Sequence, residues 1–138
     1  MDFQRQAEEF RHAYGVKDCR ENDVMQMRLI WEEFHEFEEA HLNLLTHTTD
    51  EAESLESLAL KELADLVYVA YQYACNRDWD LNTALDRVHR SNMSKLGDDG
   101  KPIRRGDGKV LKGPNYKPPY LEDLCFPVTI EKGWSQFK

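Results

Sequence analysis

The sequence predicts an all-α protein, a four-helix bundle-like subunit that continues into a basic arm rich in glycine and proline. Apolar residues recur at a spacing near 3.6 in four stretches before residue 97, and no β-type alternation of any length appears there. Six of the seven glycines and all five prolines lie from Gly97 onward. We therefore expect a helical core over residues 1–97 and an arm of the same domain over residues 98–138.

The ends of the predicted helices are marked by glycine and by clusters of polar residues. The four helices are expected over residues 2–14, 18–47 (or 21–47), 50–76 and 81–97. Gly15 stops the first, and the acids near residue 50 favour a helix N-terminus. The two long helices predict a central antiparallel hairpin. In the arm, residues 101–105 and 109–111 fit one small β-hairpin that turns at 106–108.

Length and cysteine content limit the class of protein. At 138 residues the chain is most simply one domain, and no apolar run is long enough to cross a membrane. The N-terminus is polar and helical in pattern, unlike a signal peptide. Cys19, Cys75 and Cys125 form no CxxC pair, which is typical of free thiols in a reducing compartment. This composition predicts a cytoplasmic protein.

The net charge of −8 is divided unevenly along the chain. Residues 90–119 hold eight Lys and Arg against three Asp, a net charge of +5, which leaves −13 for the remainder. A strongly acidic body with one basic segment is unlike a general nucleic-acid binder, so we expect no nucleic-acid polymer among the partners. This uneven distribution of charge favours a protein that binds a metal ion at one place and a phosphate group at another.

Two acids interrupt the apolar stretch LESLALKELADLVYVAYQYA, residues 55–74. On a helical wheel at about 100° per residue, Glu62 lies about 40° from Leu66, inside the apolar stripe. Asp65 lies about 100° from Leu66, at the edge of that stripe. Lys61 fits an ordinary solvated charge. Because a carboxylate among apolar side chains must be compensated, Glu62 does not fit a solvated helix face.

The preceding helix carries a matching pair of acids. In RLIWEEFHEFEEAHLNLL, Glu33 and Glu36 lie about 60° and 120° from Ile30, turned partly towards the core. Four inward carboxylates repel one another unless a cation neutralises them, and hard oxygen donors suit Mg²⁺ or Mn²⁺. The alternative partners for any one of these acids are three arginines: Arg28, Arg87 and Arg90.

The acids resemble the signature of a known family. The motifs EEFHE (residues 32–36) and ELAD (residues 62–65) match the EExxE and ExxD pattern of the MazG-like, all-α nucleoside triphosphate pyrophosphohydrolases. The stretches KELADLVYVAY, VHRSNMSK and DGKPIRRGDGKVLKGPNYKPP resemble the single-domain phage and bacterial members. These are related to dimeric dUTPases and to phosphoribosyl-ATP pyrophosphohydrolase. The resemblance extends over about residues 25–120.

The resemblance implies an enzyme that cleaves an NTP or dNTP to the monophosphate and pyrophosphate with Mg²⁺, for which Mn²⁺ can substitute. Similarity to phage-type members favours a deoxynucleotide such as dGTP, with dUTP as the alternative. Glu33, Glu36, Glu62 and Asp65 are implied as metal ligands, and Glu32 as the group that orients or deprotonates the attacking water. The implied substrate-binding residues are Asn92, Lys95, Arg104, Arg105, Lys109, Lys112 and Tyr116, with Asn115 a weaker candidate and Lys95 also catalytic.

Two other classes of protein share parts of this pattern. Glu32-x-x-His35 and Asp86-x-x-His89 approach the ExxH spacing of carboxylate-bridged di-iron bundles. His35, however, falls about 140° from the apolar stripe, and a di-iron protein leaves the basic arm without a role. A non-catalytic helical adaptor explains the amphipathic helices, but not five acids at the family's spacing.

The third predicted helix is apolar on a second side as well. Leu60, Ala64, Tyr68 and Tyr71 lie there, away from the stripe that faces the hairpin partner. A second apolar side predicts packing between subunits, as a homodimer or a dimer of dimers. The basic arm can then reach either the site of its own subunit or the site of a neighbouring subunit.

Overall fold

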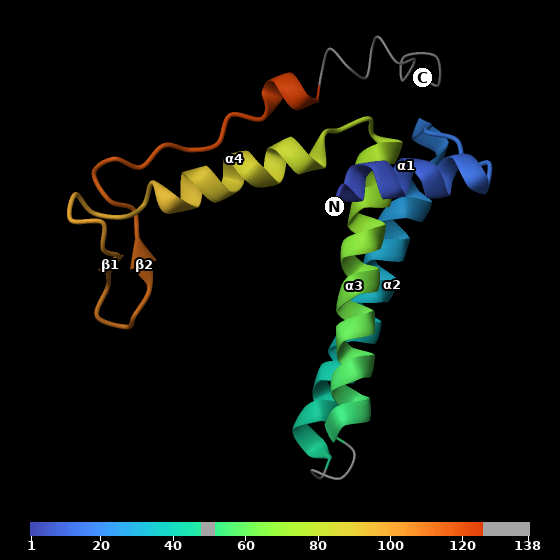
Figure 1. Cartoon of the computed structure of the whole chain (residues 1–138), viewed down its shortest axis with the longest axis horizontal. Coiled ribbons are helices and arrows are strands. Elements are labelled where there is room, and N and C mark those ends of the chain that lie inside the picture. The colour runs from blue at the N-terminus through green and yellow to red at the C-terminus, as the bar shows by residue number, and fades with distance from the viewer. Residues whose placement is uncertain (48–51, 126–138) are drawn as a thin grey trace.

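The computed structural model describes residues 1–47 and 52–125 and confirms the all-α class (Figure 1). The helices are α1 (Phe3–Ala13), α2 (Asp23–Thr46), α3 (Ala52–Asn76) and α4 (Leu81–Met93). The short elements are the 3-10 turns η1 (Arg20–Asn22) and η3 (Glu122–Leu124) and the strands β1 (Ile103–Arg104) and β2 (Val110–Leu111). The predicted start of the third helix, near residue 50, and residues 126–138 of the predicted arm lie outside the described residues.

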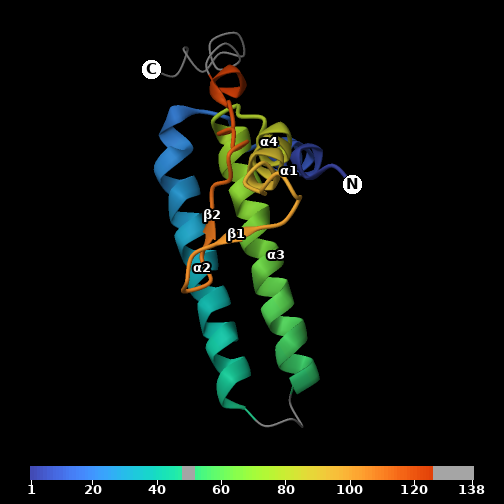
Figure 2. The ribbon, with the colours of Figure 1, turned by 90° about the vertical axis from the view of Figure 1, so that its left-hand side faces the viewer.

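The central hairpin is formed by α2 and α3, which run antiparallel and pack along each other (Figure 2). Small side chains, Ala40 of α2 and Ala59 and Ala74 of α3, are among those buried in the described part of the hairpin. Small side chains let two helices approach closely. No described helix has both the length and the apolar character that a membrane span requires.

The first helix, α1, lies across the C-terminal half of α3. The side chain of Asp2 caps it by accepting a hydrogen bond from the backbone N–H of Arg5, at 3.1 Å. Tyr71, which is 4% exposed, packs against Phe3, and their ring centroids are 5.7 Å apart. Tyr68 packs edge-on against the ring of a second phenylalanine of α1. Part of the second apolar side of α3 is therefore covered by this chain's own α1, while Leu60 remains 68% exposed.

A buried arginine fastens α1 to the hairpin. Arg11 is 3% exposed, pairs with Asp18 and donates to the side-chain oxygen of Asn76 at 2.9 Å. Asn76 is fully buried and donates in turn to the Cys19 carbonyl at 2.9 Å. It also donates to Asp23 at the start of α2, at 3.0 Å. This network joins α1, the loop after it, and the ends of α2 and α3.

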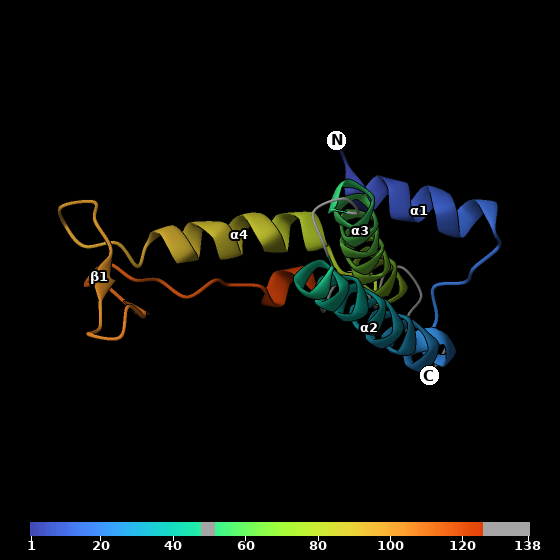
Figure 3. The ribbon, with the colours of Figure 1, turned by 90° about the horizontal axis from the view of Figure 1, so that it is seen from below.

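The fourth helix, α4, points away from the hairpin instead of packing along it (Figures 1 and 3). Asp80 caps its N-terminus by accepting from the backbone N–H of Thr83 at 3.0 Å. The arrangement is therefore more open than a closed bundle, although the helices are those that the sequence predicts. Beyond its first turns, α4 lies mainly beside the arm of its own chain (Figure 1).

The arm turns back at the end of α4 and returns beside it (Figure 1). The small β-hairpin is confirmed, with Ile103 paired to Leu111 in antiparallel register. Its turn needs the positive φ of Gly108, +89°, which glycine adopts without steric cost. The hydroxyl of Ser91 on α4 donates to the backbone carbonyl of Lys117 at 2.7 Å. Such contacts fix the path of the arm along the helix.

Candidate metal and nucleotide site

Three acids from the two hairpin helices converge at one place. Glu33 of α2 and Glu62 and Asp65 of α3 each offer one carboxylate oxygen, and these oxygens lie within 4.8 Å of one another. Glu62 is only 9% exposed, as its place inside the apolar stripe predicts. The i, i+3 spacing on α3 puts Glu62 and Asp65 on neighbouring turns of one face. Helix geometry thus builds the cluster from residues far apart in the sequence.

Two oxygens of this acid cluster are buried and have no hydrogen-bond partner: Glu33 Oε2 and Glu62 Oε2. Burial first, then a hydrogen bond to Glu36 and the charges of Glu36, Asp65 and Glu62, together raise the pKa of Glu33 from 4.5 to about 7. A cation placed among these oxygens would remove both the missing contacts and the repulsion. The donor set, made of carboxylate oxygens alone, fits a hard divalent cation such as Mg²⁺.

The other two acids of the EExxE motif lie outside the compact group of three carboxylates. Glu36 is exposed, and it is close enough to Glu33 to affect its pKa. Glu32 is exposed and lines a groove of about 620 Å³ on the side of α2, together with Trp31 and Tyr73. Three of the four predicted ligands therefore form the compact group, with Glu36 beside it and Glu32 facing solvent.

Lys61 is a part of the site that the sequence interpretation missed. Its ammonium nitrogen lies 2.7 Å from Asp65 Oδ2 and 3.5 Å from Glu62 Oε1. The hydrogen bond to Asp65 raises the pKa of Lys61, so the side chain carries a positive charge at neutral pH. The signal was present in the sequence, because Lys61 and Asp65 have the i, i+4 spacing of a helical ion pair.

The arginines proposed as partners for these acids are engaged elsewhere or lie apart. Arg87 pairs with Asp123, and Arg90 pairs with Asp86 at 3.0 Å. Arg28 lines the groove beside Glu32. In the described ranges, the ion pairs of the acid cluster are those with Lys61.

The predicted substrate-binding residues lie on α4 and the arm, which project away from the α2–α3 hairpin that carries the acid cluster (Figure 1). Several of them contact one another or nearby acids. The Lys112 ammonium lies 4.8 Å from the centre of the Tyr116 ring, and Arg105 pairs with Asp107. Asn115 donates to Asp98 at 2.7 Å. The remaining predicted residues of this group are Asn92 in α4, Lys95 after it, Arg104 in β1 and Lys109 before β2.

The pattern that suggested a di-iron centre is not assembled. His35 is exposed, its Nδ1 lies 2.8 Å from the Trp31 carbonyl, and its ring packs at a tilt against Trp31, with 4.0 Å between centroids. Asp86 pairs with Arg90. Across residues 1–47 and 52–125, the group that satisfies the geometry for a shared metal ion is the cluster of three carboxylates.

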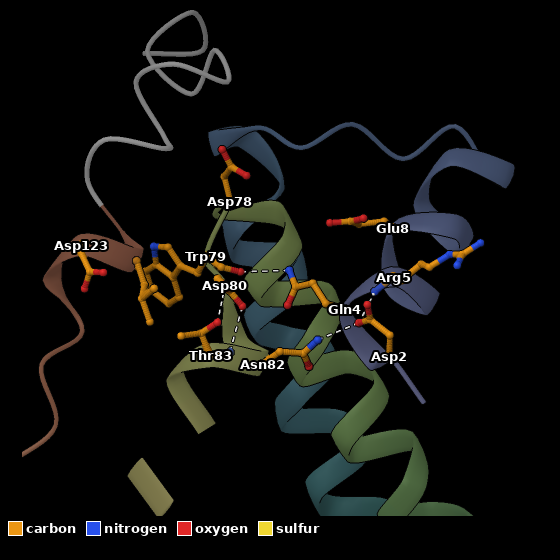
Figure 4. Close-up of a pocket in the computed structure, with 11 residues that line it drawn as sticks. Asp2, Gln4, Arg5, Glu8, Asp78, Trp79, Asp80, Asn82, Thr83 and Asp123 are labelled. Carbon is orange, nitrogen blue, oxygen red and sulfur yellow. Dashed lines mark hydrogen bonds between the residues drawn. The ribbon is translucent and has the colours of Figure 1, made fainter. Parts of the chain in front are cut away.

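A second hollow lies at the joint between α1, α4 and η3 (Figure 4). It has a volume of about 520 Å³ and many polar walls. The lining residues form hydrogen bonds with one another: Gln4 donates to the Trp79 carbonyl at 3.0 Å, and Asn82 donates to Asp2 at 2.7 Å. None of the predicted site residues lines this hollow, and its hydrogen bonds serve to fix α1 and the start of α4.

The family is decided by a comparison with protein-family models. The model described as phosphoribosyl-ATP pyrophosphohydrolase matches residues 3–92, which are 90 of the 138 residues. The chain belongs to the phosphoribosyl-ATP pyrophosphohydrolase family. A comparison with curated proteins returns no match.

Membership of the phosphoribosyl-ATP pyrophosphohydrolase family confirms the predicted MazG-like superfamily and makes the protein a hydrolase that acts on phosphoric anhydrides. It also contradicts the reading as a non-catalytic adaptor. The match includes both acidic motifs, on α2 and α3, and ends at Asn92. Lys95 and the basic arm lie beyond it.

Proposed function

We propose that this protein hydrolyses a nucleoside triphosphate, preferably a deoxynucleotide such as dGTP, to the monophosphate and pyrophosphate. The observation that carries this proposal is the cluster of Glu33, Glu62 and Asp65, with two buried carboxylate oxygens that lack a donor. A triphosphate needs its charge neutralised before water can attack it, and carboxylate-bound cations commonly do this. The cluster lies in a chain of a pyrophosphohydrolase family.

Glu33, Glu36, Glu62 and Asp65 would hold Mg²⁺, and Mn²⁺ would replace it. The donors are carboxylate oxygens, without the cysteine or histidine that zinc prefers. When bound, the cations would neutralise phosphate oxygens and lower the pKa of a water molecule. The proton that the raised pKa of Glu33 retains in the metal-free protein would leave on cation binding, because a nearby positive charge favours the carboxylate.

Glu32 would orient the attacking water and accept its proton. It precedes Glu33 on α2, and its carboxylate is exposed and therefore accessible to water. In the reaction, the water oxygen bonds to phosphorus at the α–β anhydride and the bridging P–O bond breaks. One proton of the water passes to Glu32, and the products are the monophosphate and pyrophosphate.

The basic residues would serve the site of a neighbouring subunit. Because α4 and the arm project away from their own acid cluster, they are available to a second copy of the chain (Figure 1). Lys95 would neutralise the charge that develops on the leaving phosphate. The other residues proposed to contact the phosphates or the nucleoside are Asn92, Arg104, Arg105, Lys109, Lys112 and Tyr116.

The exposed apolar surface supports a homo-oligomer, a dimer or a dimer of dimers. Leu60, Leu63 and Val67 on α3 are 68%, 41% and 45% exposed, and Leu85 on α4 is 50% exposed. Apolar side chains gathered on helices are typical of surfaces that pack against another subunit. Assembly over these faces would bury the apolar side chains and bring a neighbour's basic residues to the acid cluster.

The three cysteines are free thiols, two of them buried, which suits action in the reducing cytoplasm where nucleotides are made and used.

The test is a substrate panel with the purified full-length protein. The NTPs, the dNTPs including dUTP, and phosphoribosyl-ATP are incubated with Mg²⁺, and the monophosphate and pyrophosphate are separated by chromatography. We expect both products from at least one deoxynucleotide and their loss in Glu36→Gln. Glu38→Gln, an exposed acid on the same helix, is the matched control and should retain activity. Failure of every triphosphate to yield these products would overturn the proposal, and exclusive cleavage of phosphoribosyl-ATP would overturn the preferred substrate.

A further inference from the structure

Lys61 contacts two of the three carboxylates of the acid cluster. Its ammonium contacts one oxygen of Asp65 at 2.7 Å and one of Glu62 at 3.5 Å, and both carboxylates belong to the group that converges within 4.8 Å. Lys61 therefore touches the acids that the proposed cation needs. The side chain is 62% exposed, so it can leave the cluster for solvent without opening the hairpin.

We propose that Lys61 is the built-in counter-ion of the acid cluster and competes with the divalent cation for it. In the metal-free protein its ammonium partly neutralises Asp65 and Glu62. When a divalent cation binds these carboxylates, its positive charge repels the ammonium and displaces Lys61 towards solvent. Lys61 thereby weakens metal binding and sets the cation concentration at which the site fills. This inference rests on the metal site proposed above.

The charges of the cluster support an exchange rather than a permanent structural pair. Lys61 contributes one positive charge, which is too little for four neighbouring carboxylates, and the buried oxygens of Glu33 and Glu62 remain without a donor. A divalent cation with its higher charge satisfies those oxygens better than a monovalent ammonium on a flexible stem. An exposed ion pair of this kind is weak and is therefore displaceable.

Binding of Mn²⁺ alone, without nucleotide, tests this competition by isothermal titration calorimetry on the full chain. Lys61→Met should bind Mn²⁺ roughly three- to ten-fold more tightly than the wild type, because no ammonium has to be displaced. Lys61→Arg keeps the charge and should show no such gain. Lys17→Met removes an exposed positive charge elsewhere in the chain and should leave the affinity unchanged.

Thermal denaturation supplies a second measurement that does not depend on the calorimetric fit. The metal-free Lys61→Met protein should melt below the wild type, and saturating Mg²⁺ should raise its melting temperature by more than it raises that of the wild type. Equal or weaker Mn²⁺ binding by Lys61→Met would overturn the role of Lys61 and leave the metal site intact. A wild-type protein that binds no Mn²⁺ would overturn the metal site itself, and the competition with it.

Discussion

Replacement of Glu33 by Gln should make the metal-free protein more stable at neutral pH while it removes a proposed metal ligand. The pKa of Glu33 is raised from 4.5 to about 7 by burial and by the neighbouring acids. Because the folded-state pKa lies above the unfolded one, ionisation opposes folding. The stability associated with protonated Glu33 is full below about pH 4.5 and is lost as the pH rises through about 7.

The size of the effect follows from the width of that pH window. The difference between about 7 and 4.5 is about 2.5 pKa units, or roughly 3 kcal/mol at 1.36 kcal/mol per unit. Solvent screening of a half-buried carboxyl reduces this to about 1–2 kcal/mol. The amide of Gln does not ionise, so Glu33→Gln should be more stable than the wild type at pH 8 by this amount and nearly equal to it at pH 5.

Urea denaturation in EDTA at pH 5 and pH 8 measures these free energies of unfolding. Glu38→Gln, an exposed acid on the same helix, is the control for loss of one negative charge and should follow the wild type within about 0.5 kcal/mol. Added Mg²⁺ should stabilise the wild type more than Glu33→Gln. If Glu33→Gln loses as much stability as the wild type between pH 5 and pH 8, burial and repulsion at Glu33 are not the cause.

Three positions outside the acid cluster give further predictions. Arg11→Ala should cost about 2–4 kcal/mol in urea unfolding, because Asp18 loses its ion-pair partner and the buried side-chain oxygens of Asn76 and Gln72 each lose one donor; a cost below about 1 kcal/mol would contradict the role of this network. Gly113→Ala would place a Cβ 2.6 Å from the carbonyl oxygens of Lys95 and Leu96, just after α4, so the substitution should displace the arm. We expect activity to fall about ten-fold and trypsin to cleave the arm faster. Gly106→Ala meets no atom within 4 Å and is the control; equal behaviour of the two variants would refute the close approach. Leu60→Asp should reduce the mass measured by light scattering if α3 packs against another subunit, and an unchanged mass would exclude that face.

The acid cluster shows how far sequence reasoning reaches. The inward positions of Glu62 and Asp65 follow from the helical period alone, and the antiparallel hairpin places Glu33 opposite them. The helical wheel also placed Lys61 on α3, but its position there led to the interpretation of a solvated side chain. A long, flexible lysine can remain largely exposed and still bring its ammonium to an acid one turn away. The angle of a residue on a helical wheel describes the direction of its Cβ atom and not how far its side chain extends.

The helices, the central hairpin, the small β-hairpin of the arm and the inward positions of Glu33 and Glu62 could be predicted from the sequence, whereas Glu36, expected to turn partly towards the core, is exposed. These features depend on local causes: apolar spacing, capping aspartates and glycines that adopt positive φ. Tertiary structure alone decided that α1 covers Tyr71, that α4 leaves the hairpin and that the arm returns beside it. Those outcomes depend on contacts between segments far apart in the chain, whose geometry is set by the packing of whole helices and not by the period of any one of them.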